Sequence, residues 1–138
     1  MNLKRWAVAT VAAFVAIWVL DFYIHHVWLG PFYHAHAAWW RPEAQMQSLL
    51  PIMFLSELIL AGLLALVYAR GYELGKGTVS QGLRFGALVG LLLALPRNLI
   101  AYVIYPYPGD LIVSWIVGDL VMVTLAGAII GSIYKPGK

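Results

Sequence analysis

Four apolar stretches, at about residues 6–29, 49–69, 82–105 and 111–134, constrain this chain more than any other feature. Each has about the twenty residues that a helix needs to cross the hydrocarbon core of a bilayer. Lipid offers the backbone no hydrogen-bond partners, so a helix, which satisfies its own N–H and C=O groups, is the expected form. The sequence therefore predicts an all-α protein, a four-transmembrane-helix bundle forming one integral membrane domain over residues 1–138.

The composition also favours a membrane environment. Hydrophobic residues make up 62% of the chain and charged residues only 11%, whereas a soluble domain carries about a quarter charged residues. The net charge of +3 comes from basic residues spread over the ends of the apolar stretches, so we expect the bilayer, and not nucleic acid, as the partner. The chain contains no cysteine, which excludes disulfides and thiolate metal ligands.

The first stretch resembles a signal peptide in outline, because Lys4 and Arg5 precede an apolar run and Ala35-His36-Ala37 looks like a cleavage site. The apolar run is too long, and the site lies too far downstream, for a cleaved signal. We therefore expect a retained transmembrane helix.

The basic residues also predict the orientation. Arg41 marks the side of the 30–48 loop, and most of the other basic residues fall on the opposite side: Lys4, Arg5, Arg70, Lys76, Arg84, Lys135 and Lys138. The positive-inside rule then places both termini and the 70–81 loop, with its Gly71, Gly75 and Gly77, in the cytoplasm. Residues 31–47 on the other side could form either an interfacial helix or an ordered loop.

Small residues recur every four positions in the last two stretches. Gly82, Gly86 and Gly90 form one smooth face, and Gly127 and Gly131 form another. Such faces let helix backbones approach closely in lipid. We expect them to pack the last two helices together within the chain, with a dimer interface as the alternative.

Four ionisable residues interrupt the apolar stretches, one in each: Asp21, Glu57, Arg97 and Asp119. Each lies about eight residues, or roughly 12 Å, from the predicted outer end of its helix. Charges inside a membrane are costly and usually turn toward the bundle interior. The spacing therefore predicts one polar cluster in the outer half of the bilayer.

Two interpretations of the cluster remain open. It could be a structural salt-bridge knot centred on Arg97, with Asn98 and Ser56 adding hydrogen bonds. It could instead be a proton or cation site, since three acids against one arginine leave excess negative charge that calls for a proton or a bound cation.

The histidines lie close together in the sequence, at His25, His26, His34 and His36. Asp21 and His25 are four residues apart, so the carboxylate can orient the imidazole. Imidazoles with carboxylates are reasonable ligands for zinc, copper or nickel. The alternative is a set of interfacial histidines bonded to backbone or water. Haem is not expected, because helices two to four contain no histidine.

Several short motifs resemble those of a group of small uncharacterised bacterial four-helix membrane proteins. They are Leu20-Asp21-Phe22-x-x-His25, Tyr33, Trp40-Arg41-Pro42-Glu43-Ala44-x-Met46, Tyr68-Ala69-Arg70 and Gly82-Leu83-Arg84-Phe85-Gly86. His34 and His36 depart from the usual pattern of that group, which weakens a four-histidine site. The resemblance implies a location in the bacterial inner membrane and carries no assigned activity.

Three functions are compatible with these features. The first expectation is a non-enzymatic accessory or structural membrane protein, as a homo-oligomer or within a larger membrane complex. The alternative is a cation- or proton-coupled transporter or sensor that uses Asp21, Glu57, Arg97 and Asp119. A membrane enzyme acting on a lipid or quinone has the least support, because few polar groups lie near the interface.

Overall fold

The structure, a computed structural model, describes residues 1–76 and 78–136 and is all-α, as predicted. Four helices are long and apolar enough to cross a membrane. The first is α1 (Leu3–Phe22) with its direct continuation η1 (Tyr23–Trp28), and the others are α3 (Glu43–Arg70), α4 (Thr78–Ile104) and α5 (Gly109–Ile133). Gly77 and Lys138, which entered the predictions for the 70–81 loop and the orientation, lie outside the described residues.

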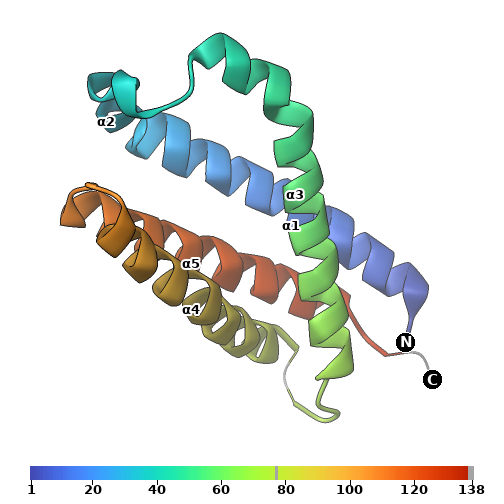
Figure 1. Cartoon of the computed structure of the whole chain (residues 1–138). Helices are drawn as coiled ribbons and strands as arrows, with labels where there is room; N and C mark the ends of the chain where they lie inside the picture. The colour runs from blue at the N-terminus through green and yellow to red at the C-terminus, as the bar shows by residue number, and fades with distance from the viewer. Residues whose placement is uncertain (77, 137–138) are drawn as a thin grey trace.

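Figure 1 shows two ends of the bundle. Both termini and the link between α3 and α4 lie at one end, called here the termini end. The other end carries α2 (Gly30–Ala35) and the link between α4 and α5, and is called the α2 end. The sequence was compatible with either an interfacial helix or an ordered loop over residues 31–47. The structure divides these residues among α2, the 3-10 turn η2 (Ala37–Trp39) and the first turn of α3.

Helix α3 begins at Glu43, several residues before the predicted start near residue 49. Pro51 lies inside it. Proline removes one N–H donor and bends a helix without necessarily ending it, and Figure 1 shows α3 changing direction in its first third. The additional turns therefore extend the helix beyond the uninterrupted apolar run.

Helices α4 and α5 form the tightest pair, and glycine is the reason. A Cβ atom built on Gly86 would lie 2.6 Å from the Val123 carbonyl oxygen, and one on Gly127 would lie 2.5 Å from the Gly82 carbonyl oxygen. No larger residue fits at either position without moving the backbones apart. The predicted packing of the glycine faces within the chain is confirmed.

Helix α1 packs between α3 and α5. Ala9, Ala13 and Ala61 are fully buried where α1 meets α3 and α5, and the Trp6 indole N–H donates to the Gly62 carbonyl at 3.2 Å. These contacts of α1 lie toward the termini end, whereas the continuation η1 still contacts α5 through Ile24, which lies beside Gly118.

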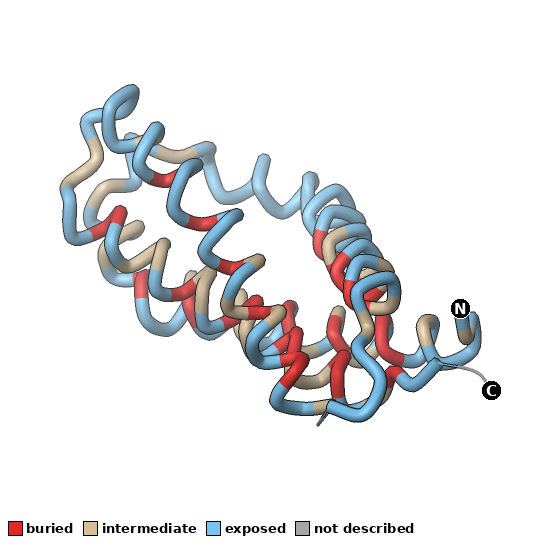
Figure 2. Tube along the Cα trace, turned by 90° about the horizontal axis from the view of Figure 1, so that it is seen from below, coloured by how far each residue is buried: buried red, intermediate tan, exposed pale blue. Residues whose placement is uncertain are grey.

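The first half of α3 leaves the bundle. Residues 41–56 are all exposed, whereas buried positions recur from Glu57 onward (Figure 2). In the described chain, α3 contacts α4 near the termini end, where the Tyr68 hydroxyl donates to the Thr78 carbonyl at 3.2 Å and the Tyr68 ring lies against Phe85. The bundle is therefore closed at the termini end and open between α3 and α4 toward the α2 end.

Candidate functional site

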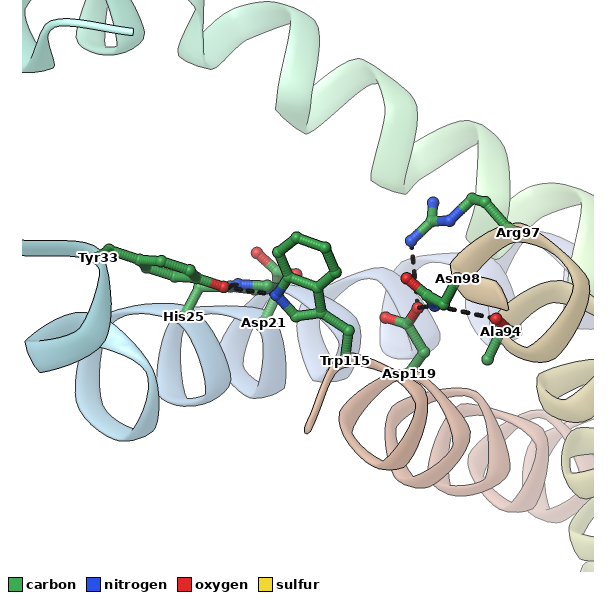
Figure 3. A network of polar contacts seen from close by, with 8 residues as sticks. All are labelled: Asp21, His25, Tyr33, Ala94, Arg97, Asn98, Trp115 and Asp119. Atoms are coloured by element: carbon green, nitrogen blue, oxygen red, sulfur yellow. Dashed lines mark hydrogen bonds and ion pairs between the residues drawn. The ribbon is translucent and has the colours of Figure 1, made fainter. Parts of the chain in front are cut away.

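A chain of polar side chains connects α2 to the end of the first long helix (Figure 3). The Tyr33 hydroxyl lies 2.7 Å from His25 Nδ1 and accepts a hydrogen bond of 2.7 Å from the Trp115 indole N–H. On its other side, His25 Nε2 lies 3.5 Å from an Asp21 carboxylate oxygen. Asp21, His25 and Tyr33 thus form a continuous chain, called here the Tyr33–His25–Asp21 chain.

The Tyr33 hydroxyl can both accept and donate within this chain. Burial raises the pKa of the Tyr33 hydroxyl above its ordinary value, although the Trp115 hydrogen bond lowers it somewhat, so Tyr33 keeps its proton at neutral pH. The hydroxyl accepts from Trp115. It donates to His25 Nδ1 in the imidazole tautomer that carries its proton on Nε2, the nitrogen that faces Asp21.

The end of the first long helix is wound as a π-helix over Tyr23–Trp28. The Leu29 N–H bonds to the Ile24 carbonyl, five residues back, at 2.9 Å. Short π-helical turns are rare and recur at functional sites, where they displace a side chain relative to a regular α-helix. Here the π-turn contains His25, so it sets the position of the imidazole between Asp21 and Tyr33.

A second polar group joins α4 to α5. The Arg97 guanidinium pairs with Asp119 Oδ2 at 3.2 Å. The buried Asn98 amide donates to the Ala94 carbonyl at 2.9 Å and to Asp119 Oδ2 at 3.4 Å (Figure 3). The Asp119 carboxylate is thus held by two donors, while the Arg97 side chain remains 74% exposed.

Asp21, Glu57, Arg97 and Asp119 all line one open cavity of about 600 Å³, called here the charged cavity. A second cavity of about 410 Å³ adjoins it toward the α2 end and shares His25, Arg97 and Asp119 with it. The rest of the second cavity is largely aromatic, with Tyr105, Tyr107 and Trp115 in its lining.

Glu57 is the unusual member of the charged cavity. The residue is only 8% exposed, and among the described residues its Oε2 atom is fully buried without a hydrogen-bond partner. A buried polar oxygen without a partner costs about 1–3 kcal/mol, and a buried charge costs more. Glu57 is therefore the position in the cavity where a proton or a cation would be most stabilising.

The knot expected around Arg97 forms only in part. Asn98 joins Arg97 at Asp119, as that interpretation required. Over residues 1–76 and 78–136, however, Arg97 forms an ion pair with neither Asp21 nor Glu57, and Ser56 lines the cavity without a side-chain hydrogen bond. The contact between Arg97 and Asp119 links α4 to α5, which the glycines already hold together. It connects neither α1 nor α3 to the other helices.

The four histidines do not converge. His25 bonds to Tyr33, His26 stacks on Phe22 with ring centroids 4.7 Å apart, and His36 Nδ1 lies 2.9 Å from the Phe32 carbonyl oxygen. His34 is exposed on α2. In the described part of the chain, no three histidine or acidic side chains are placed to hold a metal ion together, so the structure does not support the proposed zinc, copper or nickel site.

Sequence reasoning did not assign a role to Tyr33 or Trp115. Trp115 lies 82 positions from Tyr33 in the chain, and an interfacial aromatic belt accounts equally well for an isolated tryptophan. The only available signal was Tyr33 itself, which stands among the motifs that carry the resemblance described above.

Comparison of this chain with protein-family models, with curated proteins and with solved structures found no match in any of the three sets. The resemblance to small bacterial four-helix membrane proteins therefore rests on the sequence motifs alone and stays a prediction.

Proposed function

We propose that this chain is a small multi-pass membrane protein that binds protons and cations in the charged cavity, as a cation- or proton-coupled transporter or sensor. The observation that carries the proposal is the buried Glu57 carboxyl group, whose Oε2 atom has no partner in the described chain and which lies in a cavity with two further acids.

The charges of the cavity support a positively charged ligand. Three carboxyl groups face one guanidinium, and that guanidinium is already paired with Asp119. Asp21 has the His25 imidazole as a polar partner, whereas Glu57 Oε2 has none among the described residues, so Glu57 is the acid least compensated by the protein. In surroundings of low polarity this excess is relieved by a proton or by a bound cation.

The Tyr33–His25–Asp21 chain supports proton exchange at the same site. It runs from α2, at the end of the bundle, to an acid of the charged cavity. Histidine exchanges protons readily near neutral pH, and tyrosine can donate and accept at the same oxygen. Protons would enter along these side chains while larger cations enter through the open cavity.

The test is proton flux in liposomes that contain the purified protein and a trapped pH-sensitive dye. An imposed membrane potential should drive flux in the wild type, and Glu57→Gln and Asp119→Asn should abolish it. Glu43→Gln is the matched control, because it makes the same change at an exposed position of the same helix. Equal flux in wild type and Glu57→Gln would exclude the transporter form of the proposal.

A sensor would bind without transporting. In that case no variant changes the flux, but wild type takes up protons from a weakly buffered detergent solution when the pH is lowered, and Glu57→Gln takes up fewer. Glu43→Gln should take up fewer protons only by the number that one exposed carboxyl group binds. If Glu57→Gln takes up no fewer protons than Glu43→Gln, neither form of the proposal holds.

For the topology we propose one integral membrane domain in a bacterial inner membrane, with both termini in the cytoplasm. The distribution of basic residues supports this, since Arg5 and Arg70 lie at the termini end and Arg41 at the α2 end. The charged cavity then lies in the outer half of the bilayer. Fusions of a periplasm-active reporter to the C-terminus and to the 36–42 segment should be inactive and active, respectively.

A second function, as a non-enzymatic accessory subunit of a homo-oligomer or a larger complex, is favoured by one observation. Residues 41–56, which include Gln45, Gln47 and Ser48, are exposed without interruption. A helix segment that begins with polar residues and continues with exposed apolar ones is suited to contact another membrane protein. Crosslinking from Gln47→Cys in native membranes, followed by purification, should recover a stable partner; recovery of uncrosslinked chain alone would count against this function.

A further inference from the structure

We infer that the charged cavity takes an amphipathic primary amine, with its ammonium group at Glu57 and its apolar tail reaching the lipid between α3 and α4. This inference rests on the proposed function and specifies its ligand. Three features of the cavity carry it: where it opens, how its lining is divided, and which hydrogen bond it lacks.

The cavity opens sideways. Its lining comes from four helices, and the contacts that the structure gives between α3 and α4 lie at the termini end, where Tyr68 meets Thr78 and Phe85. Met53 of α3 is 37% exposed and Leu93 of α4 is 44% exposed, and both also line the cavity. A molecule dissolved in the membrane can therefore enter between these two helices without first crossing the water interface.

The lining is divided between acids and apolar side chains. Ile17, Leu60, Met122 and Val123 line the cavity together with Asp21, Glu57 and Asp119. A volume of about 600 Å³ lies in the range of pockets that hold small organic molecules, roughly 300–1,000 Å³. An inorganic ion would leave the apolar part unfilled, whereas a ligand with a charged head and an apolar tail matches both parts.

The missing hydrogen bond distinguishes between classes of cation. Among residues 1–76 and 78–136, none donates a hydrogen bond to Glu57 Oε2, and a primary ammonium group carries three N–H donors. A quaternary ammonium group carries none and would leave the oxygen unsatisfied. The geometry therefore favours a primary amine over a quaternary one with the same tail.

Affinity for labelled probes tests the inference, with the protein in phosphatidylcholine nanodiscs and empty nanodiscs as background. Dodecylamine should bind saturably, with dodecyltrimethylammonium (same tail, no N–H) and methylamine (same head, no tail) each at least about tenfold weaker. Equal binding of the quaternary amine would overturn the hydrogen-bond assignment, and equal binding of methylamine would overturn the role of the tail.

Two variants locate the site. Glu57→Gln should weaken dodecylamine binding at least about tenfold, and Glu43→Gln should not. Leu93→Trp places a larger side chain at an exposed rim position of the cavity, so it should fold normally and weaken dodecylamine binding. Retained dodecylamine affinity in Leu93→Trp would overturn the placement of the tail between α3 and α4 even if Glu57→Gln failed to fold.

The outcomes separate this inference from the proposed function. Proton uptake that depends on Glu57, without saturable dodecylamine binding, would overturn the ligand alone. Absence of both would overturn the proposed function as well.

Discussion

The Tyr33 hydroxyl lies 2.7 Å from His25 Nδ1 and so connects α2 to the π-helical end of the first long helix. The same oxygen accepts from the Trp115 indole on α5. One hydroxyl group thus connects three segments of the chain, which are α2, the π-helical turn and α5.

Replacement of Tyr33 by phenylalanine should leave the Trp115 indole N–H without an acceptor. An unpaired buried donor costs about 1–3 kcal/mol of folding free energy, and for the partly buried Trp115 we expect the lower end of that range, about 1 kcal/mol. We expect that loss in denaturant unfolding of the detergent-solubilised protein, together with faster hydrogen exchange at the Trp115 indole. The exposed Tyr105→Phe is the control and should change neither. Unchanged indole exchange in Tyr33→Phe would contradict the hydrogen bond.

Replacement of Gly86 by alanine should separate α4 from α5. The added Cβ would lie 2.6 Å from the backbone oxygen of Val123, and overpacking of this kind costs about 1–3 kcal/mol. Gly62→Ala is a matched control, because the nearest atom to its added Cβ, Thr10 Cγ2, is 3.7 Å away. The free energy of unfolding should fall for Gly86→Ala only, and equal values for both variants would show that the helices do not touch at Gly86.

The stability of the link between α3 and α4 should depend on pH through the carboxyl group of Glu73. The Lys76 ammonium, through a hydrogen bond and its charge, holds the pKa of Glu73 below its ordinary value of 4.5. A lowered pKa means that the stabilisation is fully present above pH 4.5 and is lost as the pH falls through the pKa of the folded state.

Carboxyl ¹³C NMR titration of Glu73 measures this directly. Lys76→Ala should raise the pKa of Glu73 toward its ordinary value, and Lys4→Ala should leave it unchanged. High salt should also raise it, because the pair is exposed. A Glu73 pKa that is the same in wild type and Lys76→Ala would exclude the ion pair in solution.

Replacement of Arg97 by glutamine removes the positive charge that lines the charged cavity. Without this charge, a cationic ligand is repelled less strongly. The affinity for dodecylamine should therefore rise about tenfold, which corresponds to about 1.4 kcal/mol of binding free energy. Arg41→Gln, exposed at the α2 end, is the control. Weaker binding in Arg97→Gln would mean instead that Arg97 acts mainly by holding Asp119 in place.

Much of this architecture could be predicted from periodicity and depth. The four helices follow from apolar length, and the contact of Gly86 and Gly127 follows from the four-residue spacing. Asp21, Glu57, Arg97 and Asp119 share one cavity, as their similar depth in the predicted apolar stretches indicated, although α3 itself begins earlier, at Glu43.

The pairing of these charges could not be predicted. It depends on how far α3 diverges from α4, which is set by crossing angles and by Pro51 and not by any local pattern. In the sequence, Glu57 is therefore indistinguishable from the other two acids. The structure distinguishes it, because its Oε2 atom has no hydrogen-bond partner among the described residues. The π-turn over Tyr23–Trp28 and the contact of Tyr33 with Trp115 likewise depend on tertiary packing, so no sequence motif indicates them.

The Glu57 carboxyl group, buried without a partner for Oε2 among the described residues, is the group that we propose takes up the proton or cation. Infrared spectroscopy of the purified protein measures this uptake most directly, since a protonated carboxyl group without a hydrogen bond absorbs at higher frequency than one with a partner. A pH titration of the wild type should show such a high-frequency carbonyl band that titrates and that diminishes when dodecylamine binds. The band should be absent in Glu57→Gln and present in Glu43→Gln. A band that persists in Glu57→Gln, or identical spectra for wild type and Glu57→Gln, would contradict uptake of the proton or cation at Glu57.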